Sequence, residues 1–209
     1  MVAKLLFVFG VSYLLGNLNG AVLISRLLEH DDVRSHGSGN AGFTNFFRNY
    51  GGVASLIVML IDAAKAVAAC ALGRYLMEAD GLGLEGAVLA GLAVGIGHDF
   101  PALLGFHGGK GIVCGFASFV MLDWRVALAA LAVFAAVYLI TRYVSLSSVI
   151  SAAVIGVGFI LVHYRRPLAC AGCAAMCALA IFMHRQNILR LINGTESKTD
   201  FFRKKEKDA

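Results

Sequence analysis

Charged residues are scarce in this chain. Asp, Glu, Lys and Arg make up 15% of its 209 residues, whereas soluble globular domains carry about 25% charge. The sequence is 59% hydrophobic and has a mean hydropathy of +0.77. This composition excludes a soluble domain and indicates an integral membrane protein.

Proline is nearly absent, with two residues, while glycine is abundant, with 24. A transmembrane β-barrel would alternate apolar and polar positions in segments of about ten residues. The apolar runs of this chain are longer and continuous, as expected for helices that pack through small residues. We predict an all-α fold in a single domain over residues 1–209, without an internal repeat or a linker.

The five cysteines form no disulfide framework, because they are odd in number and lie inside or at the edges of apolar runs. Cys170, Cys173 and Cys177 share one helix face, which admits a metal or redox site. No histidine or carboxylate joins them in that run, so helix packing is the preferred interpretation. No cluster of histidines and carboxylates indicates a catalytic metal, and no cofactor is expected.

Hydropathy predicts seven transmembrane helices. They lie near residues 5–25, 52–73, 85–104, 112–122, 126–140, 146–163 and 168–183. The fourth is short against the roughly 20 residues that a crossing needs, so it either crosses or is re-entrant. The N-terminal run lacks a clear cleavage site and is interpreted as a retained helix rather than a signal peptide.

The basic residues predict the orientation. Of the Lys and Arg residues in the loops and ends, twelve fall on the side that carries residues 184–209, and five fall on the other side. The positive-inside rule therefore places the N-terminus outside and the C-terminal segment, 184–209, in the cytoplasm. The net charge of +5 comes from span ends and the tail, which favours anionic lipid headgroups over nucleic acid as the partner.

The first polar segment, residues 36–45, holds three glycines among hydroxyl and amide side chains. Its backbone N–H groups are expected to converge on an anion, because glycine permits φ > 0 and a close approach. The side-chain donors are Ser38, Asn40, Thr44, Asn45 and, shortly after, Arg48. A covalent role for Ser38 is not expected, because His36 replaces the first glycine of a Gly-x-Ser-x-Gly elbow. The alternative is a plain connecting loop.

The second polar segment, residues 97–111, ends with Lys110 among three glycines before a predicted helix. An ammonium, backbone N–H groups and a helix N-terminus would all face one anion there. The spacing is not that of a P-loop, because Gly111 follows the lysine. The alternatives are a flexible turn with Lys110 as a positive-inside anchor, and His98 as a helix-end histidine rather than an acid or base.

The third polar segment, residues 184–198, follows the last apolar run and is amphipathic. It begins with His184 and contains Asn187 and Glu196. Taken alone, it is equally consistent with an interfacial helix anchored by arginines. The basic end of the chain, residues 203–207, is interpreted as a solvated or lipid-binding tail.

Two charged residues, Asp62 and Lys65, lie within the second apolar run at a spacing that places them on one helix face. An unpaired charge at the bilayer centre costs at least about 2.5 kcal/mol, so both side chains must face the bundle interior or a hydrated cavity. A structural ion pair and a contact to a substrate both remain open.

The three segments resemble the three signature motifs of the bacterial acyl-phosphate-dependent glycerol-3-phosphate acyltransferases, the PlsY family. The matching residues are Gly-Ser-Gly-Asn-x-Gly-x-Thr-Asn from Gly37, Gly-His-x-Phe-Pro from Gly97 with Phe-x-Gly-Gly-Lys-Gly from Phe106, and His-Arg-x-Asn-Ile-x-Arg-Leu-x-x-Gly-x-Glu-x-Lys from His184. Three departures are Cys114 in place of threonine, Ala66 in place of the glycine of Asp-x-x-Lys-Gly, and residues 16–20 in the first helix.

The resemblance implies transfer of an acyl group from acyl phosphate to the sn-1 hydroxyl of glycerol 3-phosphate, giving lysophosphatidate and phosphate. It implies the cytoplasmic face of a bacterial inner membrane, an upstream enzyme that forms the acyl phosphate, and no cofactor. The catalytic candidates are Ser38, Lys110 and His184. The substrate-binding candidates are Gly37, Gly39, Asn40, Thr44, Asn45, Arg48, His98, Gly108, Gly109, Gly111, Asn187 and Glu196, with Asp62 and Lys65 as an intramembrane pair.

The chemistry is compatible with these residues, because an acyl phosphate is already activated and mainly needs orientation and charge balance. His184 or His98 is a candidate proton acceptor, although a phosphate oxygen of the substrate is favoured, with His184 orienting glycerol phosphate. The acyl-CoA acyltransferase signature, a histidine followed five residues later by Asp, is absent after all six histidines. The alternative function is a membrane transporter for small phosphorylated anions.

Overall fold

The computed structural model describes residues 1–201, which form ten α-helices and two short 3-10 helices and contain no strand. The helices are α1 (Val2–Asn17), α2 (Gly20–Leu28), α3 (Phe43–Asn49), α4 (Gly52–Glu78), α5 (Gly83–Asp99), α6 (Ile112–Leu122), α7 (Trp124–Thr141), α8 (Val144–His163), α9 (Pro167–Met183) and α10 (Arg185–Ile192). The 3-10 helices are η1 (Val33–Ser35) and η2 (Ala102–Leu104). The predicted all-α membrane fold is confirmed, and the basic tail at 203–207 lies outside the described residues.

Five helical segments are long and apolar enough to cross a membrane, and α9 joined to α10 across a 53° bend would make a sixth. The remaining predicted span, at residues 112–122, is α6, which has 11 residues. At 1.5 Å per residue it is about 16 Å long, roughly half the thickness of the hydrocarbon core. Seven full spans are therefore not confirmed for residues 1–201, although the short fourth segment is where the sequence predicts it.

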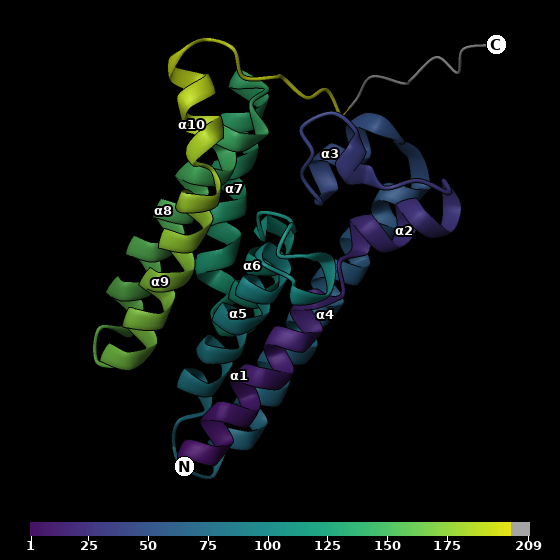
Figure 1. Ribbon diagram of the computed structural model, residues 1–209. Helices are drawn as coiled ribbons and strands as arrows, with labels where there is room; N and C mark the ends of the chain where they lie inside the picture. The colour runs from purple at the N-terminus through teal and green to yellow at the C-terminus, as the bar shows by residue number, and fades with distance from the viewer. Residues whose placement is uncertain (202–209) are drawn as a thin grey trace, which may run out of the picture.

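Helices α5 and α6 meet in the middle of the bundle rather than at its surface (Figure 1). Met1 lies at one end of the molecule, while α3 and α10 lie at the other. All three polar motif segments are near that second end or at mid-depth. Which end faces the cytoplasm stays a prediction.

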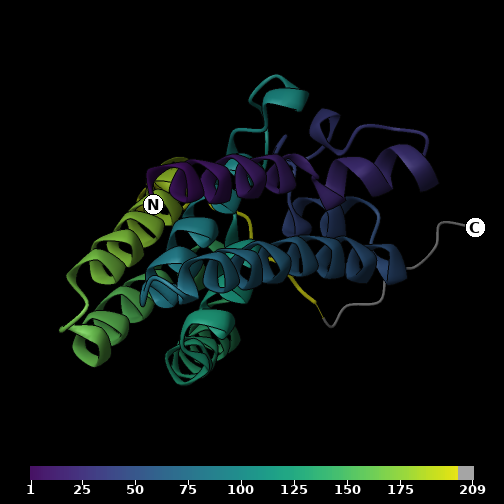
Figure 2. The same ribbon diagram turned by 90° about the horizontal axis from the view of Figure 1, so that it is seen from below.

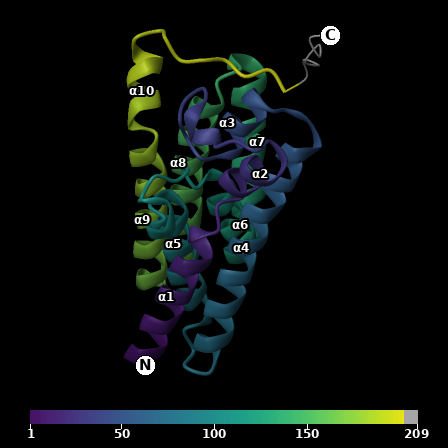
Figure 3. The same cartoon turned by 45° about the vertical axis from the view of Figure 1, so that its right-hand side comes forward.

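The helices form two groups. Helices α1 and α4 pack on α5, and α7 and α9 pack on α8, with α5 and α6 connecting the groups through α9 and α7. Figure 1 shows the pair α8 and α9 on the opposite side of α5 and α6 from α1 and α4, and the same helices are seen from below and after a 45° turn in the other views (Figure 2, Figure 3). Since the groups contact each other mainly along α5 and α6, room remains between them.

Small residues permit close helix crossings, as the glycine content predicts. A Cβ added at Gly73 of α4 would lie 2.2 Å from the carbonyl oxygen of Gly86 in α5. No side chain fits at that distance, so only glycine permits α4 and α5 to cross so closely. This crossing holds α5, which carries the second motif at its end.

The first span is broken between α1 and α2, which the sequence analysis treats as one helix. Asn19 ends the break, because its Oδ1 accepts a hydrogen bond of 3.0 Å from the backbone N–H of Val22 and so caps α2. Its amide Nδ2 donates to the carbonyl of Ala41 at 2.9 Å. The unusual run at 16–20 thus ties the first span to the first motif.

Candidate active site

One cavity of about 1,080 Å³ lies between the two helix groups and is reached by all three motif segments. Its polar wall consists of Gly37, Ser38, Asn40, Thr44, Asn45, Arg48, Asp62, His98, Asp99, Lys110, Gly111, Ser145, Ser148, His184, Asn187, Arg190, Glu196, Ser197 and Lys198. The first motif, the second motif and α10 thus contribute groups to a single site although they lie far apart in the sequence.

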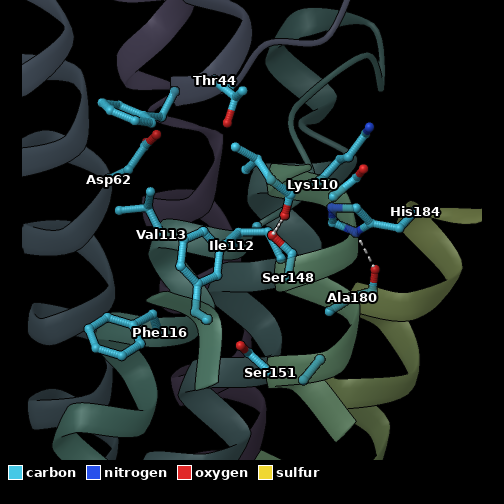
Figure 4. Close-up of a pocket in the computed structure, with 18 of the residues that line it drawn as sticks. Thr44, Asp62, Lys110, Ile112, Val113, Phe116, Ser148, Ser151, Ala180 and His184 are labelled. Atoms are coloured by element: carbon cyan, nitrogen blue, oxygen red, sulfur yellow. Dashed lines mark hydrogen bonds between the residues drawn. The ribbon is translucent and has the colours of Figure 1, made fainter. Parts of the chain in front are cut away.

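The rest of the cavity wall is apolar and comes from the membrane helices. It includes Leu60 and Val67 of α4, Phe116 of α6, Phe134 of α7 and Ile155 of α8. Thr44, Lys110 and His184 lie at the polar end, while Phe116 and Ser151 lie farther along (Figure 4). The cavity therefore joins a charged, donor-rich end to a hydrophobic corridor.

A chain of hydrogen bonds links the second motif to the third. The ammonium of Lys110 donates to Oδ1 of Asn187, and Asn187 in turn donates to Oε1 of Glu196 at 2.7 Å. Ser145 donates to the same oxygen, and Arg190 Nε donates to Oε2, both at 2.7 Å. Glu196 is thereby fully engaged and fixes the geometry of the neighbouring groups.

The electrostatic state of this network follows from its contacts. Burial, followed by the positive charge of Arg190, lowers the pKa of Lys110 to about 8. Burial opposes ionisation of Glu196, but hydrogen bonds from Ser145, Asn187 and Arg190 outweigh it, so the pKa of Glu196 is below its ordinary value. Glu196 is thus a carboxylate at neutral pH, while Lys110 begins to lose its charge just above neutrality.

His184 ends α9 and is buried, with its Nδ1 2.8 Å from the carbonyl oxygen of Ala180 (Figure 4). That oxygen only accepts, so Nδ1 carries the proton of the neutral ring. Nε2 is then left as an acceptor with no protein partner among residues 1–201. The ring can orient a hydroxyl or accept a proton at the cavity wall.

The first motif forms a turn that is stabilised by its own contacts. Asn45 is 3% exposed, accepts from the backbone N–H of Ser38 at 3.0 Å and donates to the carbonyls of Val33 and His36. The N–H groups of residues 39, 41 and 42 donate to backbone carbonyls. Convergence of the remaining N–H groups of this loop on an anion stays a prediction. Gly37 and Gly42, which have no side chain, line the cavity together with Ser38, Asn40, Thr44 and Asn45.

Arg48 lies at the cavity mouth and is bound by the segment that follows α10. Its Nε donates to Thr199 Oγ1 and its terminal nitrogen donates to the carbonyl of Ser197, each at 2.9 Å. Tyr138 donates to the carbonyl of Thr199 at 3.0 Å. The segment 195–201 thus crosses from α10 to α3, as Figure 1 shows, and covers part of the opening.

The second motif presents its glycines unequally. The N–H groups of Gly108 and Gly109 donate to the carbonyls of Asp99 and His98. Neither glycine lines the cavity, and neither does Gly39. Gly111 does line the cavity, and it is the N-cap residue of α6, with a φ of +61° in the left-handed region. No side chain among residues 1–201 caps α6. The unpaired N-terminus of α6 therefore opens beside Lys110 as a site for an anion.

Asp62 and Lys65 are 1% and 4% exposed and form the predicted ion pair, at 2.7 Å. Lys65 also donates to the carbonyl of Leu18 at 2.6 Å, and Asp62 accepts from the N–H of Gly20 at 3.2 Å. The Lys65 ammonium therefore offsets the negative C-terminal end of the α1 dipole, and the Asp62 carboxylate offsets the positive N-terminal end of the α2 dipole. This favours the structural interpretation for Lys65, which does not line the cavity, whereas Asp62 does.

His98 joins this pair, since its Nδ1 lies 2.9 Å from the Lys65 ammonium. Asp62, His98 and Cys114 bring ligand atoms within 4.8 Å of one another, a cluster that the sequence analysis does not predict. The ammonium of Lys65 contacts both Asp62 and His98. The ammonium of Lys65 thus supplies the positive charge that a metal ion would otherwise bring to Asp62 and His98.

Six residues of the polar wall are missing from the sequence-based candidates: Asp99, Ser145, Ser148, Arg190, Ser197 and Lys198. Arg190 stands inside the third motif, so its spacing from Glu196 was the usable signal. Ser145 belongs to a group of serines at the beginning of α8, which is an unusual feature of a transmembrane helix. No sequence signal points to Asp99.

Comparison with known proteins agrees with this geometry. The sequence profile of the glycerol-3-phosphate acyltransferase family matches residues 6–194. The chain belongs to the PlsY family of glycerol-3-phosphate acyltransferases. A relative named glycerol-3-phosphate acyltransferase from Thermoanaerobacter sp. (strain X514) is 39% identical over 191 residues, which cover 90% of this chain and 92% of the relative. One of the same name from Parasynechococcus marenigrum is 41% identical, covering 92% and 89%.

Two crystal structures of PlsY, an integral membrane glycerol 3-phosphate acyltransferase, share this fold. The glycerol 3-phosphate form has a TM-score of 0.84 at 30% identity and covers 94% of this chain and 96% of its own. The lysophosphatidic acid form has a TM-score of 0.81 at 29% identity. As a member of the PlsY family, this chain is thus an acyltransferase with a multi-pass membrane fold.

Two departures from the PlsY-family pattern are accommodated in the core. Cys114 donates through Sγ to the carbonyl of Asp62 at 3.3 Å, in the manner that a threonine hydroxyl would. Ala66 is fully buried and packs with Val8, Val94 and Cys114. Neither residue lines the cavity, so both affect packing around the site rather than its wall.

Proposed function

We propose that this protein transfers an acyl group from an acyl phosphate to the sn-1 hydroxyl of glycerol 3-phosphate, giving lysophosphatidate and phosphate. The observation that carries the proposal is the single cavity in which a cationic end continues into an apolar corridor. A fatty acyl phosphate has the same two parts, a phosphate and a long hydrocarbon chain. Glycerol 3-phosphate is small and anionic and fits the polar end alone.

The cations account for the binding of two phosphates. Arg48, Lys110 and Arg190 line the polar end, and the uncapped beginning of α6 adds backbone donors. Two anions that approach each other are stabilised only where such donors are already in place. Ser38, Asn40 and Thr44 supply further donors from the opposite wall.

The chemical step requires no covalent enzyme intermediate. The sn-1 hydroxyl oxygen attacks the carbonyl carbon, the bond from that carbon to the phosphate oxygen breaks, and the leaving phosphate takes the hydroxyl proton. Nε2 of His184 orients the acceptor hydroxyl. None of the hydrogen bonds among residues 1–201 joins the side chain of Ser38 to a histidine, so Ser38 is assigned to phosphate binding rather than to nucleophilic attack.

The apolar corridor also favours an enzyme over the transporter alternative. A pathway for small phosphorylated anions would be polar along its length, whereas α4, α6 and α7 line this one with aliphatic and aromatic side chains. We place the polar end at the cytoplasmic face of a bacterial cell membrane, where an upstream enzyme that forms acyl phosphate would supply the donor.

The proposal is tested with purified protein in detergent, given glycerol 3-phosphate and either palmitoyl phosphate or palmitoyl-CoA. Lysophosphatidate, measured by mass spectrometry, should form with palmitoyl phosphate as the donor and not with palmitoyl-CoA. The acyl group should be at sn-1, and the Lys110→Ala variant should form no product. Product from palmitoyl-CoA at an equal or greater rate would overturn the donor assignment. Acylation at sn-2 would overturn the assigned position.

A further inference from the structure

One carboxylate at the site has an oxygen without a hydrogen-bond partner in the described part of the chain, residues 1–201. Asp99 ends α5, is 3% exposed and lines the cavity. Its Oδ1 is buried and accepts no hydrogen bond from any group in residues 1–201. Every other cavity carboxylate is bound by the protein, because Asp62 pairs with Lys65 and Glu196 pairs with Arg190.

A buried carboxylate oxygen without a hydrogen bond lowers the stability of the folded protein. Native proteins retain such an oxygen mainly where a ligand supplies the missing hydrogen bond. The oxygen faces Gly111, where an added Cβ would lie 3.0 Å from it. Any larger residue at that position would press on Oδ1, so glycine leaves the oxygen uncovered by a side chain. Two residues of the second motif segment thus form this part of the cavity wall, and one of them, Asp99, stands at a position that the family pattern leaves unspecified.

The chemistry of the oxygen limits what can fill this space. A carboxylate oxygen only accepts hydrogen bonds, so its partner must carry an O–H or N–H group. A phosphate dianion carries none, and in the proposed function it is bound by Arg48, Lys110 and Arg190 instead. If the proposed function holds, the remaining polar groups at this end are the two hydroxyls of glycerol 3-phosphate.

The surroundings of Asp99 distinguish between these hydroxyls. The attacking hydroxyl gives up its proton, and a base must pass that proton on. Oδ1 has no hydrogen-bonded neighbour through which a proton could leave. A standing hydrogen bond from the hydroxyl that does not react suits the oxygen better than a proton transfer does.

We propose that Asp99 accepts a hydrogen bond from the non-reacting sn-2 hydroxyl of glycerol 3-phosphate and so selects a glycerol phosphate over monohydroxy phosphates. This inference rests on the proposed function and assigns Asp99 as a residue that determines acceptor specificity. A site built to bind a hydroxyl rejects an analogue that lacks it, because its own polar group is then left unpaired.

The test compares glycerol 3-phosphate with 3-hydroxypropyl phosphate, which has the same chain and lacks only the secondary hydroxyl. Wild-type protein should prefer glycerol 3-phosphate by about ten-fold to a hundred-fold in kcat/KM, as the loss of one buried hydrogen bond predicts. Asp99→Leu should remove most of this preference by raising KM for glycerol 3-phosphate. Asp99→Asn keeps an acceptor oxygen and should retain much of it.

The ratio of the two kcat/KM values is taken within one preparation, so a change in the folded fraction cancels. If Asp99→Leu is not recovered folded, Asp99→Ala replaces it. Equal losses with both acceptors, or no change in the ratio, would overturn the inference. A wild-type protein that acylates neither acceptor would instead refute the proposed function.

Discussion

Lys110 is the cation whose charge depends most closely on pH, because burial and the nearby Arg190 lower its pKa to about 8. A lowered lysine pKa means that the charged form is present below about pH 8 and is lost as the pH rises through that value. We expect kcat/KM for glycerol 3-phosphate to fall above pH 8 by about ten-fold per unit, since free-enzyme titrations appear in kcat/KM.

The matched variant is Lys110→Arg, whose guanidinium stays charged throughout this range. Its pH profile should be flat from pH 7 to about pH 9, even if its absolute activity is lower. Rates are measured in buffers of constant ionic strength with the uncatalysed hydrolysis of acyl phosphate subtracted. The same decline in both proteins would show that another group controls the profile.

At this scale the sequence identified most of the site. Lys110, Asn187 and Glu196 were candidates and form one hydrogen-bonded chain. Asp99 could not be predicted, because its place in the cavity wall and its lack of a hydrogen-bond partner among residues 1–201 arise only in the folded chain. The backbone role expected of the first loop stays a prediction, because the N–H groups of residues 38, 39, 41 and 42 are bonded within the protein whereas Gly37 and Gly42 line the cavity.

Among the helices, the break between α1 and α2 depends on the ion pair of Asp62 and Lys65 in α4. Lys65→Met would leave Asp62 buried without its cation and expose the carbonyl end of α1, at a cost of about 3–5 kcal/mol. The double variant with Asp62→Asn should regain part of this loss, because no charge is then left unpaired. Thermal unfolding in detergent measures both.

The exposed ion pair of Lys4 and Asp80, at 2.6 Å, provides the control. Lys4→Met should change the free energy of unfolding by about 1 kcal/mol or less, as surface pairs do. A double variant as unstable as Lys65→Met alone would contradict the capping role of the pair.

The elements themselves were largely predictable, since long apolar runs give the helices and their order. The interruption at residues 17–20 was not predicted, although Asn17, Asn19 and Gly20 interrupt the apolar run there. It is specified by the capping of α2 by Asn19 and by contacts with α4. The depth of α6 in the bundle could not be predicted from hydropathy either. Hydropathy gives the length of an apolar segment but not where in the bundle the segment begins.

For the molecule as a whole, the corridor between the helix groups should set the length of the acyl chain. Gly115 of α6 lines it, and a Cβ added there meets nothing within 4 Å. Gly115→Phe should therefore fill the corridor. The preference for palmitoyl over octanoyl phosphate should fall about ten-fold or more, since each excluded methylene forfeits about 0.8 kcal/mol of burial.

The control is Gly10→Phe in α1, where an added Cβ also meets open space but lies outside the cavity. Its chain-length preference should match that of the wild type in competition assays with mixed donors. A corridor variant with unchanged preference would mean that the acyl chain lies elsewhere. The corridor itself was not visible in the sequence, because its walls are ordinary membrane-facing residue types.

The central claim is that the cavity binds both substrates at once and transfers the acyl group directly. It is tested most simply by following phosphate release and lysophosphatidate formation together, with each substrate alone and with both. The account predicts equal amounts of the two products, only when palmitoyl phosphate and glycerol 3-phosphate are both present. Phosphate released from palmitoyl phosphate alone, with acylated protein, would contradict it, as would uptake of intact glycerol 3-phosphate into vesicles without any acyl transfer.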